Sequence, residues 1–91
     1  MKYIVYVIYN NESHRTYVEQ TNSLSHRLAE HNAGLSTWTS RFPGTWEVIH
    51  QEVFDSRSAA IRRERQLKSG GGRRFIQSLV AALEDGEDRG R

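Results

Sequence analysis

The stretch that decides the fold runs from Thr16 to Asn32 and reads Thr-Tyr-Val-Glu-Gln-Thr-Asn-Ser-Leu-Ser-His-Arg-Leu-Ala-Glu-His-Asn. Its first half holds the strand-forming pair Tyr17-Val18, and its second half repeats apolar side chains at helical spacing, so it predicts a strand that leads into a helix. Arg27 and His31 lie four residues apart and share one surface of that helix. A guanidinium and an imidazole together suit a phosphate group, although a solvated arginine beside a helix-end histidine fits the same spacing.

The residues before this stretch predict a further strand and a hairpin. Residues 3–9 are aromatic or β-branched throughout, and residues 10–13 supply turn chemistry before a strand at 15–20. Because the first strand is apolar on both faces, we expect it at the centre of a sheet that is covered on both sides. The hairpin register is open, so Tyr6 and Tyr17 are either core residues with satisfied hydroxyls or neighbours on one face.

The residues after the helix predict a loop, a third strand and a second helix. Ala33-Gly34 is a typical helix end, and the hydroxyl-rich loop that follows contains Trp38 and Arg41. These two side chains suit stacking on a base and contact with a phosphate, while Trp38 fits a place over the core equally well. Residues 45–54 form the third strand, and a helix capped by Asp55 or Ser56 comes next.

Glu64 is an unusual residue within that second helix, which runs to about Lys68. It falls among the apolar positions Ala60, Ile61 and Leu67, where the helix should face the protein. A buried carboxylate is costly unless it is paired or bound to a metal. Glu64 is therefore either a site residue or one half of an internal ion pair with an arginine.

The rest of the chain predicts a third helix and a tail. Ser69-Gly70-Gly71-Gly72 breaks the second helix, and an apolar stripe then continues to Leu83. The element order, strand-strand-helix-strand-helix-helix, indicates the α/β (α+β) class for residues 1–83. Residues 84–91 are charged and contain no large apolar side chain, so we expect a disordered tail there.

Bulk properties narrow the class of protein. The chain has 91 residues, no cysteine and a formal net charge of +2, so it predicts one domain without disulfides or thiolate metal sites. No apolar run has the length of a membrane span, and a cytoplasmic location is the expectation. The segment 57–74 is strongly basic, as expected for a protein that binds a polyanion, although solvated basic helix faces are common. It holds a single acid, Glu64, and seven cations: Arg57, Arg62, Arg63, Arg65, Lys68, Arg73 and Arg74.

Four segments, in this order and spacing, match the motifs of one known superfamily. They are Val5-Tyr6-Val7-Ile8, Tyr17-Val18-Glu19, residues 21–32 and residues 54–68. On these motifs the chain resembles the GIY-YIG nuclease superfamily over roughly residues 2–77, and most closely its small stand-alone members. Those members are similar to the N-terminal nuclease module of the excinuclease that cuts damaged DNA.

The resemblance implies a fold and a reaction. The fold is a small three-stranded antiparallel sheet flanked by three helices, and the reaction is hydrolysis of DNA phosphodiester bonds with one divalent metal, Mg²⁺ or Mn²⁺. Glu64 would anchor the metal, and Arg27 would stabilise charge on the scissile phosphate. Tyr6, Tyr17 and His31 would position or deprotonate the attacking water, in a division of labour that the sequence leaves open.

The resemblance also implies a nucleic-acid-binding surface on a domain without a targeting module of its own. Its candidate contacts are Trp38, Arg41, Arg62, Arg63, Arg65, Lys68, Arg73 and Arg74. The substrate would be single-stranded, duplex or branched DNA, in repair for example, and a protein partner would supply targeting.

One departure from the motifs concerns activity. Glu19 stands where the second motif has a glycine. This carboxylate would repel a phosphate, serve as a second metal ligand, or point to the other face of the sheet and do nothing. The alternative function is therefore a catalytically weakened nucleic-acid-binding domain of the same fold.

Overall fold

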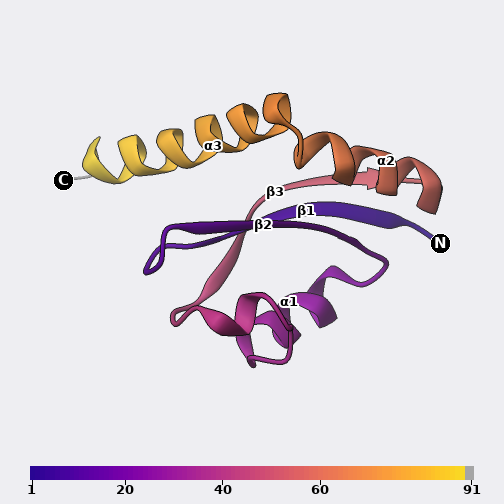
Figure 1. Cartoon of the computed structure of the whole chain (residues 1–91), viewed down its shortest axis with the longest axis horizontal. Coiled ribbons are helices and arrows are strands. Elements are labelled where there is room, and N and C mark those ends of the chain that lie inside the picture. Colours follow the sequence, from indigo (N-terminus) through magenta and orange to yellow (C-terminus); the bar gives the residue numbers. More distant parts are fainter. Residues whose placement is uncertain (90–91) are drawn as a thin grey trace.

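Three strands form one antiparallel sheet, and three helices cover it (Figure 1). The computed structural model describes residues 1–89. Its elements are β1 (Tyr3–Asn10), β2 (Arg15–Thr21), α1 (Leu24–Asn32), the short 3-10 helix η1 (Thr39–Arg41), β3 (Trp46–Phe54), α2 (Arg57–Leu67) and α3 (Gly70–Arg89). The strand order is β2-β1-β3, so the most apolar strand lies in the middle. The expected fold class, sheet and number of helices are confirmed.

The β1–β2 hairpin register places the candidate tyrosines on one face. Tyr6 lies directly opposite Glu19, and Ile8 lies directly opposite Tyr17. Because opposite residues of an antiparallel pair point to the same side, these four side chains share a face of the sheet. The register that the sequence left open therefore gathers both tyrosines and Glu19.

Helices cover the two faces separately (Figure 1). Helix α1 lies against the face that carries Tyr6 and Ile8, where Trp46 completes the buried cluster. Helices α2 and α3 cover the opposite face, whose buried cluster is fully apolar and comprises Val5, Val7, Val18, Ala60, Leu67 and Ile76. Burying a Val, Leu or Ile side chain contributes roughly 1.5–3 kcal/mol, so this cluster holds α2 and α3 firmly against the sheet.

Asn32 fixes the end of α1 against the sheet. Its side-chain carbonyl accepts from the Trp46 backbone N–H at 2.7 Å, and its amide donates to the Trp46 carbonyl at 3.1 Å. This pair of hydrogen bonds joins α1 to the first residue of β3 across the intervening loop. The helix that carries Arg27 and His31 is thereby held at one orientation over the sheet.

The junction between α2 and α3 corrects one expectation. The expected break at Ser69-Gly70-Gly71-Gly72 is confined to Lys68-Ser69, because the three glycines form the first turn of α3. A Cβ at Gly72 would overlap the backbone of Gln66 and Leu67. Gly72 is therefore needed because the start of α3 packs directly on the end of α2, a tertiary contact that local propensity does not report.

The carboxyl end of the chain also differs from expectation. Helix α3 continues past Leu83 to Arg89, so residues 84–89 are helical where a disordered tail was expected. The Glu84 carboxylate accepts a hydrogen bond from the Tyr9 hydroxyl at 3.2 Å, which ties this turn to β1. Residues 90–91 of the expected tail lie outside the described residues. Within residues 1–89, no helix has both the length and the apolar character needed to span a membrane.

Candidate active site

The Glu19 carboxylate is the point on which the candidate site converges. Tyr6 Oη donates to Oε1 at 2.6 Å, and Tyr17 Oη donates to Oε2 at 3.0 Å. The guanidinium of Arg27 donates from Nε to Oε1 at 2.8 Å and from Nη2 to Oε2 at 3.2 Å. Four charge-assisted hydrogen bonds thus hold the two oxygens of one anion, two of them from a bidentate arginine.

Local structure explains how these groups meet. Tyr17 and Glu19 are two residues apart on β2 and point to the same side, because side chains alternate along a strand. Helix α1 begins after its N-cap Ser23, and Arg27 lies one turn further on, above the same face. Leu24 and Leu28 pack against the buried cluster on that face and orient the arginine toward the sheet.

His31 is buried next to the Tyr6 hydroxyl, with 2% of its surface exposed. Its Nε2 is 2.8 Å from Tyr6 Oη, and its Nδ1 is 2.8 Å from Thr39 Oγ1. Because the single proton of the Tyr6 hydroxyl goes to Glu19, a neutral His31 in this arrangement carries its proton on Nε2 and accepts from Thr39 at Nδ1. The histidine is a buried support for Tyr6.

The protonation states follow from burial and from these neighbours. Burial, together with the Glu19 hydrogen bond and charge, raises the pKa of Tyr6 far above its usual value, and burial and the Glu19 charge raise the pKa of Tyr17 to about 12. Burial lowers the pKa of His31, with a further contribution from the Arg27 charge. At neutral pH both phenols and the imidazole are therefore uncharged.

Glu19 and Arg27 remain ionised. Burial works to raise the pKa of Glu19, but the hydrogen bonds from Arg27, Tyr6 and Tyr17 outweigh it, and the pKa lies below its ordinary value. The Glu19 hydrogen bond likewise raises the pKa of Arg27. The centre of the site is thus the permanently ionised Glu19 carboxylate, hydrogen-bonded to Arg27, Tyr6 and Tyr17. Glu19 does not point to the other face of the sheet, and its oxygens are engaged by donors that a metal would have to displace.

Glu64 approaches the outer edge of β2 from helix α2. Its Oε1 accepts from the backbone N–H of Gln20 at 2.9 Å, and its Oε2 pairs with Lys68 Nζ at 3.1 Å. Its charge contributes, after burial and Glu19, to the raised pKa of Tyr17. The sequence left open an internal ion pair of Glu64 with an arginine; Glu64 is indeed paired, but its partner is Lys68, four residues further along the chain.

The Glu64 carboxylate suits a metal ion that is held by a single protein ligand and otherwise by water and substrate. Within the described residues no group of three or more His, Cys, Asp or Glu side chains could enclose an ion. Mg²⁺, however, retains several waters and uses one or two carboxylates together with substrate phosphate. The Glu64 Oε2, paired with a half-exposed and exchangeable ammonium, suits such a single protein ligand.

The loop residues divide between core and surface. Trp38 stacks on Tyr17, with ring centroids 5.4 Å apart and planes at 17°, and its ring also contacts Phe42 and Trp46. It therefore lies over the core, as one of the two interpretations expected, and remains only half-buried. Arg41 ends η1 and is exposed.

Most of the expected basic residues are exposed, and two of them, Arg63 and Lys68, already pair with a carboxylate. Arg63 donates from Nε and Nη2 to the two carboxylate oxygens of Glu52 at 2.9 and 3.0 Å, so its charge is already paired. The exposed candidates on α2, α3 and the junction between them are Arg62, Arg65, Lys68, Arg73 and Arg74.

The site has two residues that the sequence did not assign to it: Thr39, for which no role was predicted, and Glu19, for which a role as second metal ligand was one of three alternatives. Glu19 is its centre, and the available signal was its position two residues after Tyr17, which places both on one strand face. Thr39 is buried and holds the far nitrogen of His31. No local pattern marks it, because the loop brings it to His31 only through tertiary packing.

Comparisons with known proteins identify the family and the fold. The family model described as the GIY-YIG catalytic domain matches residues 2–75. A UPF0213 protein of Haloquadratum walsbyi is 37% identical over 67 residues, which cover 74% of this chain and 73% of that protein. A UPF0213 protein of Natronomonas pharaonis is 42% identical over 53 residues, 58% of this chain, and the match spans 62% of that protein's length. The solution NMR structure of a UPF0213 protein from Bacillus halodurans is similar in fold, with a TM-score of 0.52, 23% identity and coverage of 87% of this chain and 85% of that one.

Proposed function

Because the chain belongs to the GIY-YIG family of catalytic domains, we propose that it is an endonuclease that hydrolyses DNA phosphodiester bonds with Mg²⁺ or Mn²⁺. The observation that carries this proposal is the convergence of Tyr6, Tyr17 and Arg27 on a single bound oxyanion. A carboxylate and a phosphodiester both present two oxygens to such donors, so a site that holds one suits the other. Glu64 reaches the edge of β2 from the other face of the sheet, near enough for its charge to contribute, after burial and Glu19, to the raised pKa of Tyr17, and its carboxylate suits one metal.

The chain's residues would act on the scissile phosphate as follows. When the Glu19 side chain swings aside, Arg27 binds the two non-bridging oxygens, and the Tyr6 and Tyr17 hydroxyls donate to the charge that develops on them. Burial, the largest cause of the raised pKa of Tyr17, persists when Glu19 moves away and helps to keep the hydroxyl proton in place for that donation. His31 holds Tyr6 in position from below. A divalent metal at Glu64 would supply further charge neutralisation and acidify a bound water.

A second candidate function is favoured by Glu19 itself. Its carboxylate is ionised and occupies the donors that a phosphate would need, so substrate entry must break a half-buried ion pair. A domain with this obstacle would bind nucleic acid through its basic surface and cleave slowly or not at all.

We propose that the same protein works in the cytoplasm, in repair for example, with a protein partner for targeting.

A cleavage assay separates these functions. Labelled single-stranded, duplex and branched DNA are incubated with Mg²⁺ or Mn²⁺ and with the native protein, Glu64→Ala, or the matched control Glu47→Ala, an exposed carboxylate on β3. The endonuclease proposal expects cleavage that disappears with Glu64→Ala and with chelator but persists with Glu47→Ala. A folded native protein that binds all three DNA forms and cuts none would leave the binding domain as its function.

A further inference from the structure

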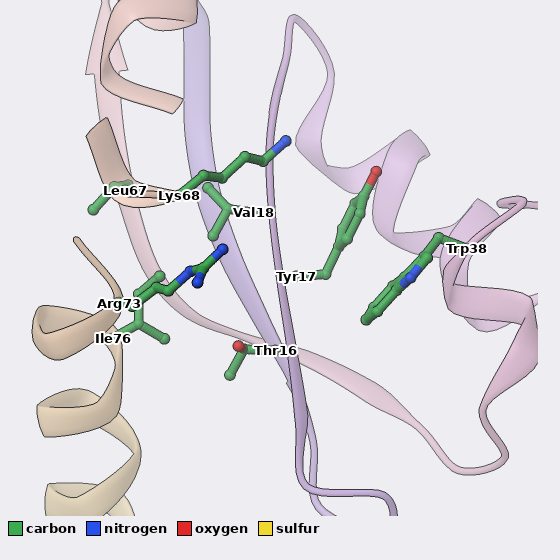
Figure 2. A pocket seen from close by; sticks show the side chains of 8 residues that line it. All are labelled: Thr16, Tyr17, Val18, Trp38, Leu67, Lys68, Arg73 and Ile76. Carbon is green, nitrogen blue, oxygen red and sulfur yellow. The ribbon is translucent and has the colours of Figure 1, made fainter. Parts of the chain in front are cut away.

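A groove of about 340 Å³ runs along the outer edge of strand β2 (Figure 2). We call it the edge groove; it is lined by Thr16, Tyr17, Trp38, Lys68, Arg73 and Ile76, among others. The groove lies beside the cluster formed by Glu19, Tyr6, Tyr17 and Arg27, which we call the Glu19 cluster. The groove and the cluster share only Tyr17. Its volume is at the lower end of the range of small-ligand pockets, roughly 300–1,000 Å³, and is of the size of one nucleotide.

The two walls of the edge groove differ in chemistry. Figure 2 shows Tyr17 and Trp38 on one side of β2, and Lys68 and Arg73 approaching from the α2–α3 side, with Thr16 between them. The aromatic wall is built from Tyr17 and Trp38, whose rings stack on each other, so a base would pack against the ring edges. The basic wall offers Arg73, an exposed cation that no described carboxylate neutralises, and Lys68, whose half-exposed ammonium also pairs with Glu64.

The edge groove continues beyond a single nucleotide. A second cavity of about 250 Å³ shares Thr16, Arg73 and Ile76 with it and extends to Gln77. Arg73 therefore lies between two adjoining cavities, as expected for a cation that contacts the phosphate between two successive nucleotides.

We propose that the edge groove binds unpaired nucleotides of a single-stranded segment, with a base against Tyr17 and Trp38 and a phosphate between Lys68 and Arg73. This rests on the proposed function, because Tyr17 borders both the groove and the cluster that would hold the scissile phosphate. The bases of a duplex are buried in their own stack and cannot enter a cavity of this size. Single-stranded segments, or the single strands of branched DNA, are thus the preferred substrates.

A peptide added as a further strand on β2 is the competing occupant, since an edge strand presents unpaired backbone groups. Two observations favour nucleic acid. The Gln20 N–H on this edge is already taken by the Glu64 carboxylate, which blunts the edge for strand pairing. The groove also offers two cations and two aromatic rings, which complement phosphates and bases.

Adjacent arginines provide a matched test. Arg73 lines the groove, whereas Arg74 is exposed on the same turn of α3 and does not line it. Binding of fluorescein-labelled octathymidylate, and of a hairpin duplex, is measured by fluorescence anisotropy in EDTA, so that no cleavage interferes. We expect Arg73→Ala to weaken octathymidylate binding about tenfold and to reduce the salt slope by about 0.7, whereas Arg74→Ala, which removes a cation of the general basic surface outside the groove, weakens octathymidylate and duplex binding equally, by about twofold.

A second variant leaves the basic residues untouched. Thr16→Glu places an anion on the groove floor, and we expect it to abolish octathymidylate binding while the duplex, held only by the general basic surface, binds weakly in every variant. Equal losses for Arg73→Ala and Arg74→Ala, or tighter binding of the duplex, would overturn the groove proposal and leave the proposed function standing. If neither DNA form binds and an acidic hexapeptide instead shifts the β2 amide resonances in NMR, both proposals fail.

Discussion

Glu19 and Glu64 are two carboxylates beside strand β2 whose burial is nearly equal and whose surroundings differ. Their side chains are 24% and 20% exposed. Glu19 receives four hydrogen bonds from three side chains that cannot move far. Glu64 is fixed through one oxygen by a backbone N–H, while its other oxygen pairs with a half-exposed lysine.

Because the two carboxylates are nearly equally exposed, the difference shows that hydrogen-bond partners, more than burial, decide whether a half-buried carboxylate is free to bind a ligand. Glu19 is a satisfied anion that occupies a ready-made oxyanion site, so its removal should open that site. Glu64 has one half-exposed partner, so the metal that we propose there would replace the Lys68 ammonium and leave the hydrogen bond from the Gln20 N–H in place. The following experiments test this contrast, from the largest expected effect to the smallest.

Glu19→Gly should produce the largest change. Removing the internal anion frees Arg27 and both tyrosine hydroxyls for a phosphate, and we expect cleavage of labelled single-stranded DNA to rise by about 100-fold, the equivalent of breaking a half-buried ion pair. Glu19→Gln, which keeps the shape and removes the charge, should give a smaller gain. A Glu19→Gly variant that cuts no faster than the native protein would contradict the claim that Glu19 blocks the phosphate position.

The same contrast should appear in stability. Glu19→Ala leaves Arg27 and two hydroxyls without their partner, so we expect the free energy of unfolding in urea to fall by about 2–3 kcal/mol. Glu64→Ala should lower it by only about 1 kcal/mol, because one backbone N–H and one half-exposed lysine lose a partner. Equal losses would mean that the four hydrogen bonds to Glu19 contribute no more than the two to Glu64.

The pH dependence of stability should separate His31 from Glu19. The pKa of His31 is lowered on folding, so the unfolded chain takes up its proton first, and stability falls as pH drops below about 6.5 toward the folded value. The pKa of Glu19 is also lowered, so its contribution is present above about 4.5 and is lost as pH falls through its folded value. His31→Phe should remove the first phase in urea titrations, and the exposed control His26→Gln should keep it.

The two tyrosines should differ least. Tyr6 Oη contacts both Glu19 and His31, whereas Tyr17 Oη contacts Glu19. We expect Tyr6→Phe to lower the free energy of unfolding by about 1–2 kcal/mol and Tyr17→Phe by about 0.5–1 kcal/mol. The reverse order in urea denaturation would show that Tyr17, and not Tyr6, is the more important support of the Glu19 carboxylate.

Local patterns predicted much of this molecule. Alternating and continuous apolar runs located the three strands, and caps such as Ser56, whose side chain accepts from Ala59 N, marked helix starts. The odd position of Glu64 among apolar residues pointed to a constrained carboxylate, and the structure shows one. These features depend on neighbours within a few residues.

What the sequence left open depends on contacts between distant segments. The place of Glu19 follows from the register of the hairpin, which pairs it with Tyr6. Gly72 looks like a helix breaker in isolation, yet it lies in the first turn of α3 because α2 packs against it. Thr39 reaches His31 through a loop whose path is set by the aromatic cluster. Spacing along the chain carries no information on these three contacts.

The most direct test of the central claim, that Glu19 occupies the phosphate position, is the NMR resonance of Arg27 Nε–Hε. It is followed during titration with a thymidine dinucleotide in EDTA, in the native protein and in Glu19→Ala. We predict that the native resonance, hydrogen-bonded to Glu19 Oε1, does not shift, and that the resonance in Glu19→Ala shifts until saturation. Equal shifts in both proteins would show that Glu19 does not hold the site against phosphate.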